Sequence, residues 1–185
     1  MTHLPRLLAA ALAVVALPAL AGRYAPVPDE SSLRFASSYE GETFEGRFAR
    51  FDASIVFDPE DLDTARFDVS IPLSEAGTGN TDRDETLHGR DFFDVARFPI
   101  ATFVAERFRP LGGDRYAADG MLSLRGSGAP VTLEFTWSGG DRPVLRGEAT
   151  VNRLEFDVGG GDWGDTALIP DAVRVTTHLM LEPQG

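Results

Sequence analysis

The feature that most constrains how this chain folds is a period-two alternation of apolar and polar residues. In residues 66–71 and 131–137, every second residue is apolar and the residues between them are polar or charged. Successive side chains of a strand point to opposite faces, so each such segment predicts a strand with one buried face. The alternating segments span residues 33–39, 51–57, 67–73, 101–105, 116–124, 131–137, 145–151 and 173–181.

Turn residues separate these segments and favour antiparallel neighbours joined by short loops. Residues 112–114, 139–141 and 126–130 are the expected hairpin turns, because they are rich in Gly, Asp and Pro. About eight strands with one apolar face each must bury those faces together, as a sandwich or a closed barrel does. Two segments break the alternation: residues 81–94, where we expect Thr81 to cap a short helix, and a flexible glycine-rich loop at 159–165.

The first 21 residues have the three-part pattern of a secretory signal peptide. Arg6 supplies a basic start, residues 7–17 are an uninterrupted apolar run, and small residues around Ala19 and Ala21 form a cleavage site. The apolar run is short for a span of about 30 Å of hydrocarbon. We therefore expect a signal peptide at residues 1–21, cleavage near Ala21, and a periplasmic domain at residues 22–185.

Charge and composition exclude several classes of function. The chain has 29 acidic and 17 basic residues, a net charge of -12 and no cysteine. This balance argues against a nucleic-acid partner, which attracts basic surfaces, and the lack of cysteine excludes thiol catalysis and Cys-ligated metal. Beyond the signal peptide only two histidines occur, His88 and His178, and no hydrolase or metalloprotease motif is present. We expect a protein without metal, cofactor or catalysis; a small periplasmic enzyme using the loops around His88 and Asp162 is an alternative.

The aromatic content gives the stronger functional signal. Thirteen Phe residues place many large side chains on inward positions, while several inward positions hold Ala or Gly. Such a set either fills a barrel or lines a cavity that holds one ligand, and the pattern alone leaves both open. Arg83 and Arg153 lie beside acidic residues near irregular segments. Each is either a structural ion pair that pins a loop or a contact for an anionic head group.

Three motifs give the chain a family resemblance. They are TDRD at residues 81–84, DFFD at 91–94 and NRLEF at 152–156. With them the mature chain resembles the YceI-like, polyisoprenoid-binding family of exported bacterial proteins over essentially its whole length. It departs from the family pattern at Asp157, where Gly is usual, and at Arg125 and the residues that follow it.

The resemblance implies an all-β fold, an eight-stranded antiparallel lipocalin-like barrel with a short helix in one crossover. It implies a non-catalytic binding protein that holds a long isoprenoid or similar amphiphilic lipid, such as a quinone or a polyprenyl phosphate. The alternative is a structural barrel with a filled interior that acts through a membrane redox protein; the oligomeric state, including a dimer, stays open. Arg83 and Arg153 are the candidate head-group residues. The expected cavity residues are Phe35, Phe51, Ile55, Phe67, Val69, Phe93, Phe103, Leu122, Leu133 and Phe135.

Overall fold

The computed structural model describes residues 22–184, and the predicted signal peptide lies outside them. In this part of the chain, eleven strand segments and one α-helix follow one another, with short 3-10 turns between some of them. The strands are β1 (Arg23–Pro26), β2 (Ser32–Tyr39), β3 (Glu42–Phe48), β4 (Asp52–Val56), β5 (Arg66–Pro72), β6 (Ala76–Gly77), β7 (Ile100–Gly112), β8 (Arg115–Leu124), β9 (Ser127–Ser138), β10 (Val144–Asn152) and β11 (Ala172–Pro183), and the helix is α1 (Thr81–His88).

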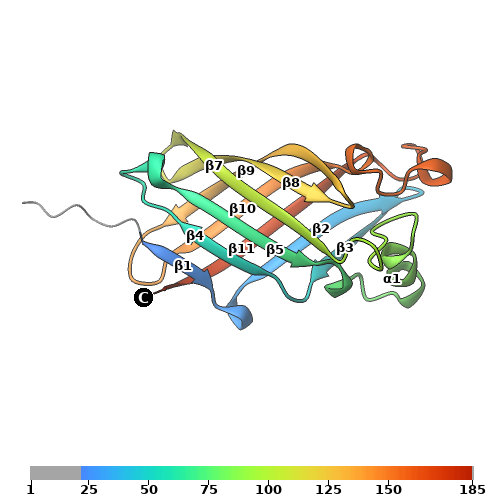
Figure 1. The fold of residues 1–185 in the computed structure, drawn as a ribbon, viewed down its shortest axis with the longest axis horizontal. Helices are drawn as coiled ribbons and strands as arrows, with labels where there is room; N and C mark the ends of the chain where they lie inside the picture. The colour runs from blue at the N-terminus through green and yellow to red at the C-terminus, as the bar shows by residue number, and fades with distance from the viewer. Residues whose placement is uncertain (1–21, 185) are drawn as a thin grey trace, which may run out of the picture.

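Eight of these strands close into an antiparallel barrel, as the sequence predicts. The ring runs β1-β4-β5-β7-β8-β9-β10-β11 and returns to β1, and the strands cross the elongated barrel obliquely (Figure 1). Closure removes unpaired strand edges, which in an open sheet would invite aggregation.

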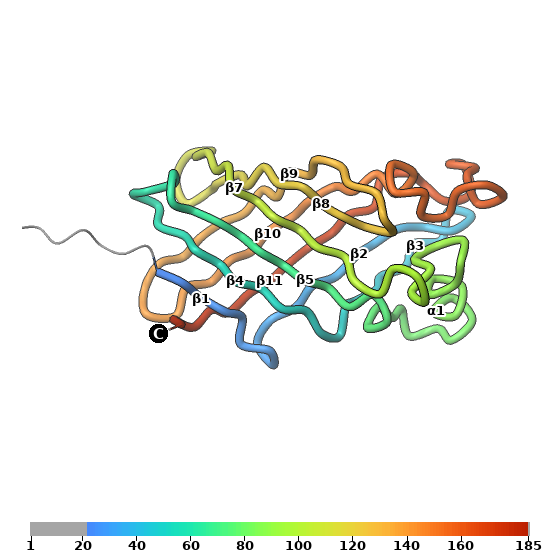
Figure 2. Tube along the Cα trace, viewed as in Figure 1, coloured from blue at the N-terminus to red at the C-terminus, as the bar shows by residue number. Residues whose placement is uncertain are grey.

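The last strand changes partner along its length. Its early part, Arg174–His178, pairs with β2, whereas Leu181–Pro183 pairs with β1. β3 and then β6 extend the sheet from β2. The C-terminus therefore lies beside β1 at one end of the barrel, and α1 and the loop that precedes β11 lie at the other end (Figure 2).

The helix occurs where the sequence predicts it but begins with a different cap. The side chain of Asn80, rather than Thr81, accepts a hydrogen bond from the backbone N–H of Arg83 at 3.0 Å. Asn is among the best N-cap residues, so its side chain satisfies one of the unpaired N–H groups of the first turn. The carboxylate of Asp84 also accepts bonds from the N–H and hydroxyl of Thr78, at 2.7 and 2.6 Å, and these bonds hold the helix against the preceding loop.

Two of the three expected hairpin turns match and one is shorter than expected. Residues 112–114 join β7 to β8, and residues 139–141 lie between β9 and β10. The third turn does not occupy residues 126–130, because β9 already begins at Ser127. Arg125 and Gly126 make this turn alone, both with positive φ (50° and 77°), as a two-residue hairpin turn requires.

The two ends of the barrel interior are filled differently. At the β1 end, six aromatic side chains form a dense cluster, here called the aromatic plug. Phe57 lies at its centre, with its ring centroid 4.9–6.1 Å from those of five other rings. Phe57 is 1% exposed, so this end is as tightly filled as a protein core. The plug consists of Phe57, Phe67, Phe108, Tyr116, Phe135 and Trp137.

Candidate functional site: an apolar cavity in the barrel

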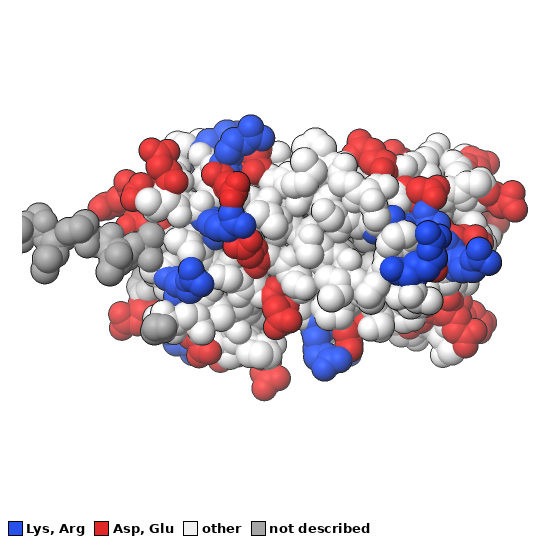
Figure 3. Space-filling model, in the orientation of Figure 1, with Lys and Arg blue, Asp and Glu red and all other residues white. Residues whose placement is uncertain are grey.

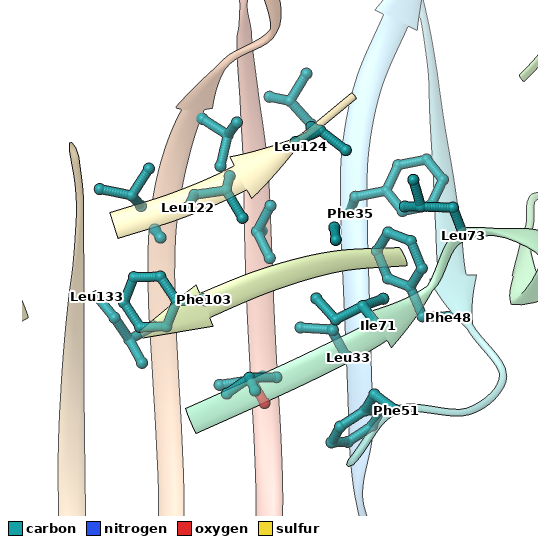
Figure 4. A pocket seen from close by; sticks show the side chains of 18 of the residues that line it. Leu33, Phe35, Phe48, Phe51, Ile71, Leu73, Phe103, Leu122, Leu124 and Leu133 are labelled. Carbon is teal, nitrogen blue, oxygen red and sulfur yellow. The ribbon is translucent and has the colours of Figure 1, made fainter. Parts of the chain in front are cut away.

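The half of the barrel nearer α1 encloses a cavity of about 220 Å³. Side chains from several strands converge on it, as Figure 4 shows for Phe35, Phe103 and Leu122 among others. Of its 31 lining residues, only Ser37, Arg153 and Thr177 are polar or charged. The volume is slightly below the roughly 300–1,000 Å³ of typical ligand pockets, and the lining suits an apolar guest.

Nine of the ten expected cavity residues lie on the wall of this cavity. The exception is Phe135, which is a correction: it is 3% exposed and its ring lies 5.2 Å from that of Phe57 in the aromatic plug. Alternation gives the face on which a residue lies but not its depth along the bore. Phe67 touches both regions, because it lines the cavity and also contacts the plug. The nine residues on the wall are Phe35, Phe51, Ile55, Phe67, Val69, Phe93, Phe103, Leu122 and Leu133.

Exposure separates the hollow half of the interior from the filled half. Phe103, Val131 and Leu133 point inward yet remain half-buried, because their inner surfaces face empty space. Phe57 in the plug is inward-facing too and has no such free surface. The sequence pattern is compatible with a filled barrel and with a hollow one. In the structure, one half of the barrel interior is filled and the other half is hollow.

Glycines on the wall give the aromatic rings room to lie flat against it. A Cβ at Gly120 would stand 2.6 Å from the ring of Phe103 and 2.7 Å from the carbonyl oxygen of Val104. A Cβ at Gly46, the cross-strand partner of Phe35, would overlap the Phe35 ring in the same way. At these two positions a larger residue would push a phenylalanine into the bore, so the glycines keep the cavity open.

The α1 end of the cavity carries a second set of apolar residues, most of them aromatic, that the sequence interpretation did not include. Phe44 on β3, Leu87 on α1 and Phe92 line the cavity there. The ring of Trp163 lies 5.5 Å from that of Phe92 and 6.5 Å from that of Tyr39. Loops from distant parts of the chain thus meet around this end of the bore, which is called the mouth below.

Arg83 lies at the mouth, over the ring of Phe44. Its guanidinium carbon is 4.4 Å from the ring centroid, a cation–π distance. Among the described residues, no carboxylate lies within ion-pair distance of this guanidinium. Phe44 lines the cavity and Arg83 does not. A head-group role for Arg83 stays a prediction.

Arg153 has a structural role, and its assignment as a head-group residue is corrected. It is 3% exposed, and its five N–H groups donate to the carbonyl oxygens of five residues. An arginine has five N–H donors, so none is left for a ligand. Burial lowers the pKa of the guanidinium, against the opposite effect of Asp171. The glycine-rich loop, expected to be flexible, is pinned by these bonds; the acceptors are Val158, Gly159, Trp163, Ile169 and Pro170.

The two departures from the family pattern contact each other. The carboxylate of Asp157 forms an ion pair with the guanidinium of Arg125, which also donates to the carbonyl oxygen of Arg90 at 2.8 Å. Asp157 has a φ of 55°, in the left-handed region that favours Gly and tolerates Asp better than most residues. The departures therefore form one added link between the β8–β9 turn and the loop that follows β10.

The two histidines of the described residues lie in different surroundings. The Nε2 of His88 lies 2.8 Å from the carbonyl oxygen of Ala76, so it donates and ties α1 to β6. His178 lies on the outer face of β11, in a surface groove beside the ion pair of Arg115 and Glu134. Within residues 22–184, no three His, Asp or Glu side chains are grouped so that they could hold a metal ion. Over the same residues, no helix has both the length and the apolar character that crossing a membrane requires.

The fold and cavity define a class: small antiparallel barrels whose interior encloses an apolar cavity. A family model, the YceI-like domain, matches residues 24–181. The chain therefore belongs to the YceI-like family, and the resemblance drawn from its motifs is confirmed.

Similar sequences include proteins named only by family. A UPF0312 protein of Yersinia pestis (strain Pestoides F) is 37% identical over 94 residues, 51% of this chain and 48% of that protein. A UPF0312 protein of Pseudomonas savastanoi pv. phaseolicola is 28% identical over 134 residues, 68% of this chain and 70% of that protein. The chain aligns with about half the length of the first of these relatives.

Solved structures share the barrel. BcnA of Burkholderia cenocepacia superposes with a TM-score of 0.79 and 29% identity, over 83% of this chain and 98% of BcnA. A polyisoprenoid binding domain from Saccharophagus degradans, described as implicated in plant cell wall breakdown, gives a TM-score of 0.67 and 17% identity over 90% of this chain and all of that domain. The Campylobacter jejuni YCEI protein gives 0.68 at 20% identity over 76% of this chain and 84% of that one. The last two likenesses concern the fold alone.

Proposed function

We propose that this protein is a periplasmic binding protein that holds a long isoprenoid or similar amphiphilic lipid in the barrel cavity, without catalysis. One observation carries the proposal: a closed barrel has an almost wholly apolar cavity in one half while the other half is filled. Because the β1 end of the interior is filled and the α1 end is hollow, the cavity suits a ligand whose apolar tail enters first from the α1 end. The fold shared with a domain described as polyisoprenoid binding supports the same class of ligand.

Burial of the tail supplies the affinity. Each buried CH₂ contributes about 0.8 kcal/mol, so ten carbons give about 8 kcal/mol before the costs of association. Before those costs are subtracted, this free energy is on the scale of about micromolar binding. Because the free cavity measures about 220 Å³, a long tail fits only if side chains of the cavity wall rearrange.

Export is the second part of the proposal. Its support is the signal-peptide pattern of residues 1–21, which precede the described residues. A protein that shields an apolar chain from water is useful in an aqueous compartment between two membranes. Amino-terminal sequencing of the protein from the periplasm checks this part; an amino terminus near Gly22 is expected, and an intact Met1 contradicts it.

Extraction of the purified protein with organic solvent, followed by mass spectrometry, tests the ligand class. Isoprenoid lipids should appear in the extract and should rebind to the emptied protein. Leu122→Trp places a large side chain in the bore and should abolish rebinding while the protein remains folded. Met121→Trp is the matched control, since Met121 is the neighbouring residue, 50% exposed on the outer face.

Two results would reject the proposal. One is an empty extract together with no uptake of long-chain isoprenoids. The other is equal rebinding by the Leu122 and Met121 variants, because a blocked bore cannot hold the tail. The rival role, a barrel that acts only through a membrane redox protein, predicts a filled interior, which the cavity beside Leu122 does not match.

A further inference from the structure

The polar side chains on the cavity wall differ in whether their hydrogen-bonding capacity is used. Arg153 uses all five donors on carbonyl groups. The hydroxyl of Thr177 donates to the carbonyl oxygen of Ser32 at 3.2 Å. The hydroxyl of Ser37 is buried and has no partner among the described residues. A buried unpaired hydroxyl costs free energy, so a group that pairs with it would be stabilised there.

The position of Ser37 places its hydroxyl near the mouth. Ser37 lies on β2 opposite Phe44 of β3, beyond Leu33 and Phe35, which face the same bore deeper in the barrel. Phe44 carries Arg83 over its ring, and Arg83 does not line the cavity. A ligand that lies tail-inward in the bore would bring its polar head to the level of Ser37.

We propose that Ser37 is a hydrogen-bonding site for an uncharged oxygen-bearing head group, such as the hydroxyl or carbonyl of an isoprenoid alcohol or quinone. This inference rests on the proposed function and specifies its ligand. The single hydroxyl of Ser37 can form a hydrogen bond with one neutral oxygen of a ligand. A phosphate has several charged oxygens, and within residues 22–184 the cavity wall offers them no further free donors. Removing a charged group from water without partners is far more costly than removing a neutral one.

Binding of three probes with one tail tests the inference. The probes are geranylgeraniol, geranylgeranyl monophosphate and the corresponding hydrocarbon, each titrated calorimetrically. The wild-type protein should bind the alcohol at least about tenfold more tightly than the monophosphate. Ser37→Ala should weaken alcohol binding about threefold to tenfold, the worth of one hydrogen bond, and leave hydrocarbon binding unchanged.

Thr177→Val is the matched control, because it removes a hydroxyl from the same wall whose partner is the protein itself. It should leave the preference for alcohol over hydrocarbon intact. Unfolding of the ligand-free Ser37→Ala protein gives a second readout: its melting temperature should equal or exceed that of the wild type, since the lost hydroxyl had no partner. A lower melting temperature would show that the hydroxyl has a structural role.

Failure of the two proposals is distinguishable. If none of the three probes binds, the lipid-binding function itself is wrong, and the Ser37 site falls with it. If the probes bind but Ser37→Ala changes nothing, only the head-group site is wrong. Tighter binding of the monophosphate that is lost in Arg83→Gln would overturn the Ser37 site and move the head group to the arginine at the mouth.

Discussion

The two halves of the barrel interior use the same residue type in opposite ways. In the plug, Phe57 touches five other aromatic rings and is 1% exposed. In the hollow half, Phe103 lies against the wall over Gly120 and faces the cavity with its other side. Dense aromatic packing closes one end and stabilises the barrel, so the other end can remain unfilled.

Charged residues on the outer surface are also unevenly distributed along the barrel. Arginines and acidic residues occupy both ends of the face shown in Figure 3, while a largely uncharged band lies between them. On the outer face of β8, the charged residue Asp119 lies over the plug. The next two outward residues toward the hollow half, Met121 and Ser123, are exposed and uncharged. Electrostatic contributions on this strand are therefore concentrated over the filled half.

Truncation of the plug should have the largest effect. Phe57→Ala leaves a cavity among five rings and should lower the free energy of unfolding by about 3–5 kcal/mol. Phe103→Ala should cost less than about half as much, because one side of that ring already faces empty space. Urea denaturation measures both; equal losses would show that the two halves are packed alike.

Removal of the buried guanidinium should have the next largest effect, and a local one. Arg153→Met leaves five carbonyl groups without their donor, at an expected cost of about 2–4 kcal/mol. Hydrogen exchange should accelerate in residues 157–170 and stay slow in β9 and β10. Uniform acceleration over the whole barrel would contradict the role of Arg153 as an anchor for this one loop.

A methyl group behind Phe103 should narrow the bore at moderate cost. Gly120→Ala places a Cβ against the ring and should lower stability by about 1–3 kcal/mol, while weakening lipid binding. Gly139→Ala is the control, since nothing lies within 4 Å of a Cβ there. Unchanged stability and binding in the Gly120 variant would show that the wall accommodates the added methyl group without moving the Phe103 ring into the cavity.

Lowering the pH should have the smallest effect on the free energy of unfolding, through Asp119 on the outer face over the plug. A hydrogen bond from Thr132 and then Arg109 lower the pKa of Asp119 below its ordinary value. The unfolded chain then binds a proton first, so this contribution is present at neutral pH and is lost as pH falls below about 4. Asp119→Asn should reduce the loss of stability between pH 7 and pH 3 by less than about 1 kcal/mol; an unchanged acid response would contradict it.

The sequence predicts the barrel well because alternation and turns are local signals. The need to bury eight apolar faces predicts a sandwich or a closed barrel, and the family resemblance, carried by motifs such as DFFD at 91–94, implies the barrel. The inward faces of β4, β5 and β7 are read correctly for the same reason. Phe44 and Phe48 in β3 also alternate with charged residues, so the same rule applied to residues 42–48 would have found them.

Depth and hydrogen-bonding partners are not local, and there the sequence interpretation fails. Phe135 has the inward pattern of a cavity residue, but its depth in the plug depends on strand stagger around the ring. In the sequence, Arg153 looks like an arginine that could pair with neighbouring acidic residues. Its actual partners are five carbonyl groups, which are brought to it only by the fold of the loop. Ser37 shows no sign in the sequence of being unpaired, because that property depends on Phe44 and the neighbouring strands.

Xenon binding to crystals of the protein, grown after its lipid has been removed by solvent extraction, would most directly test whether one half of the barrel is hollow and the other filled. Xenon enters apolar cavities that are empty and needs no knowledge of the natural ligand. Electron density for xenon is predicted among Phe35, Leu122 and Val131, with none between Phe57 and the rings around it. Xenon within the aromatic cluster, or none anywhere inside the barrel, would contradict the account.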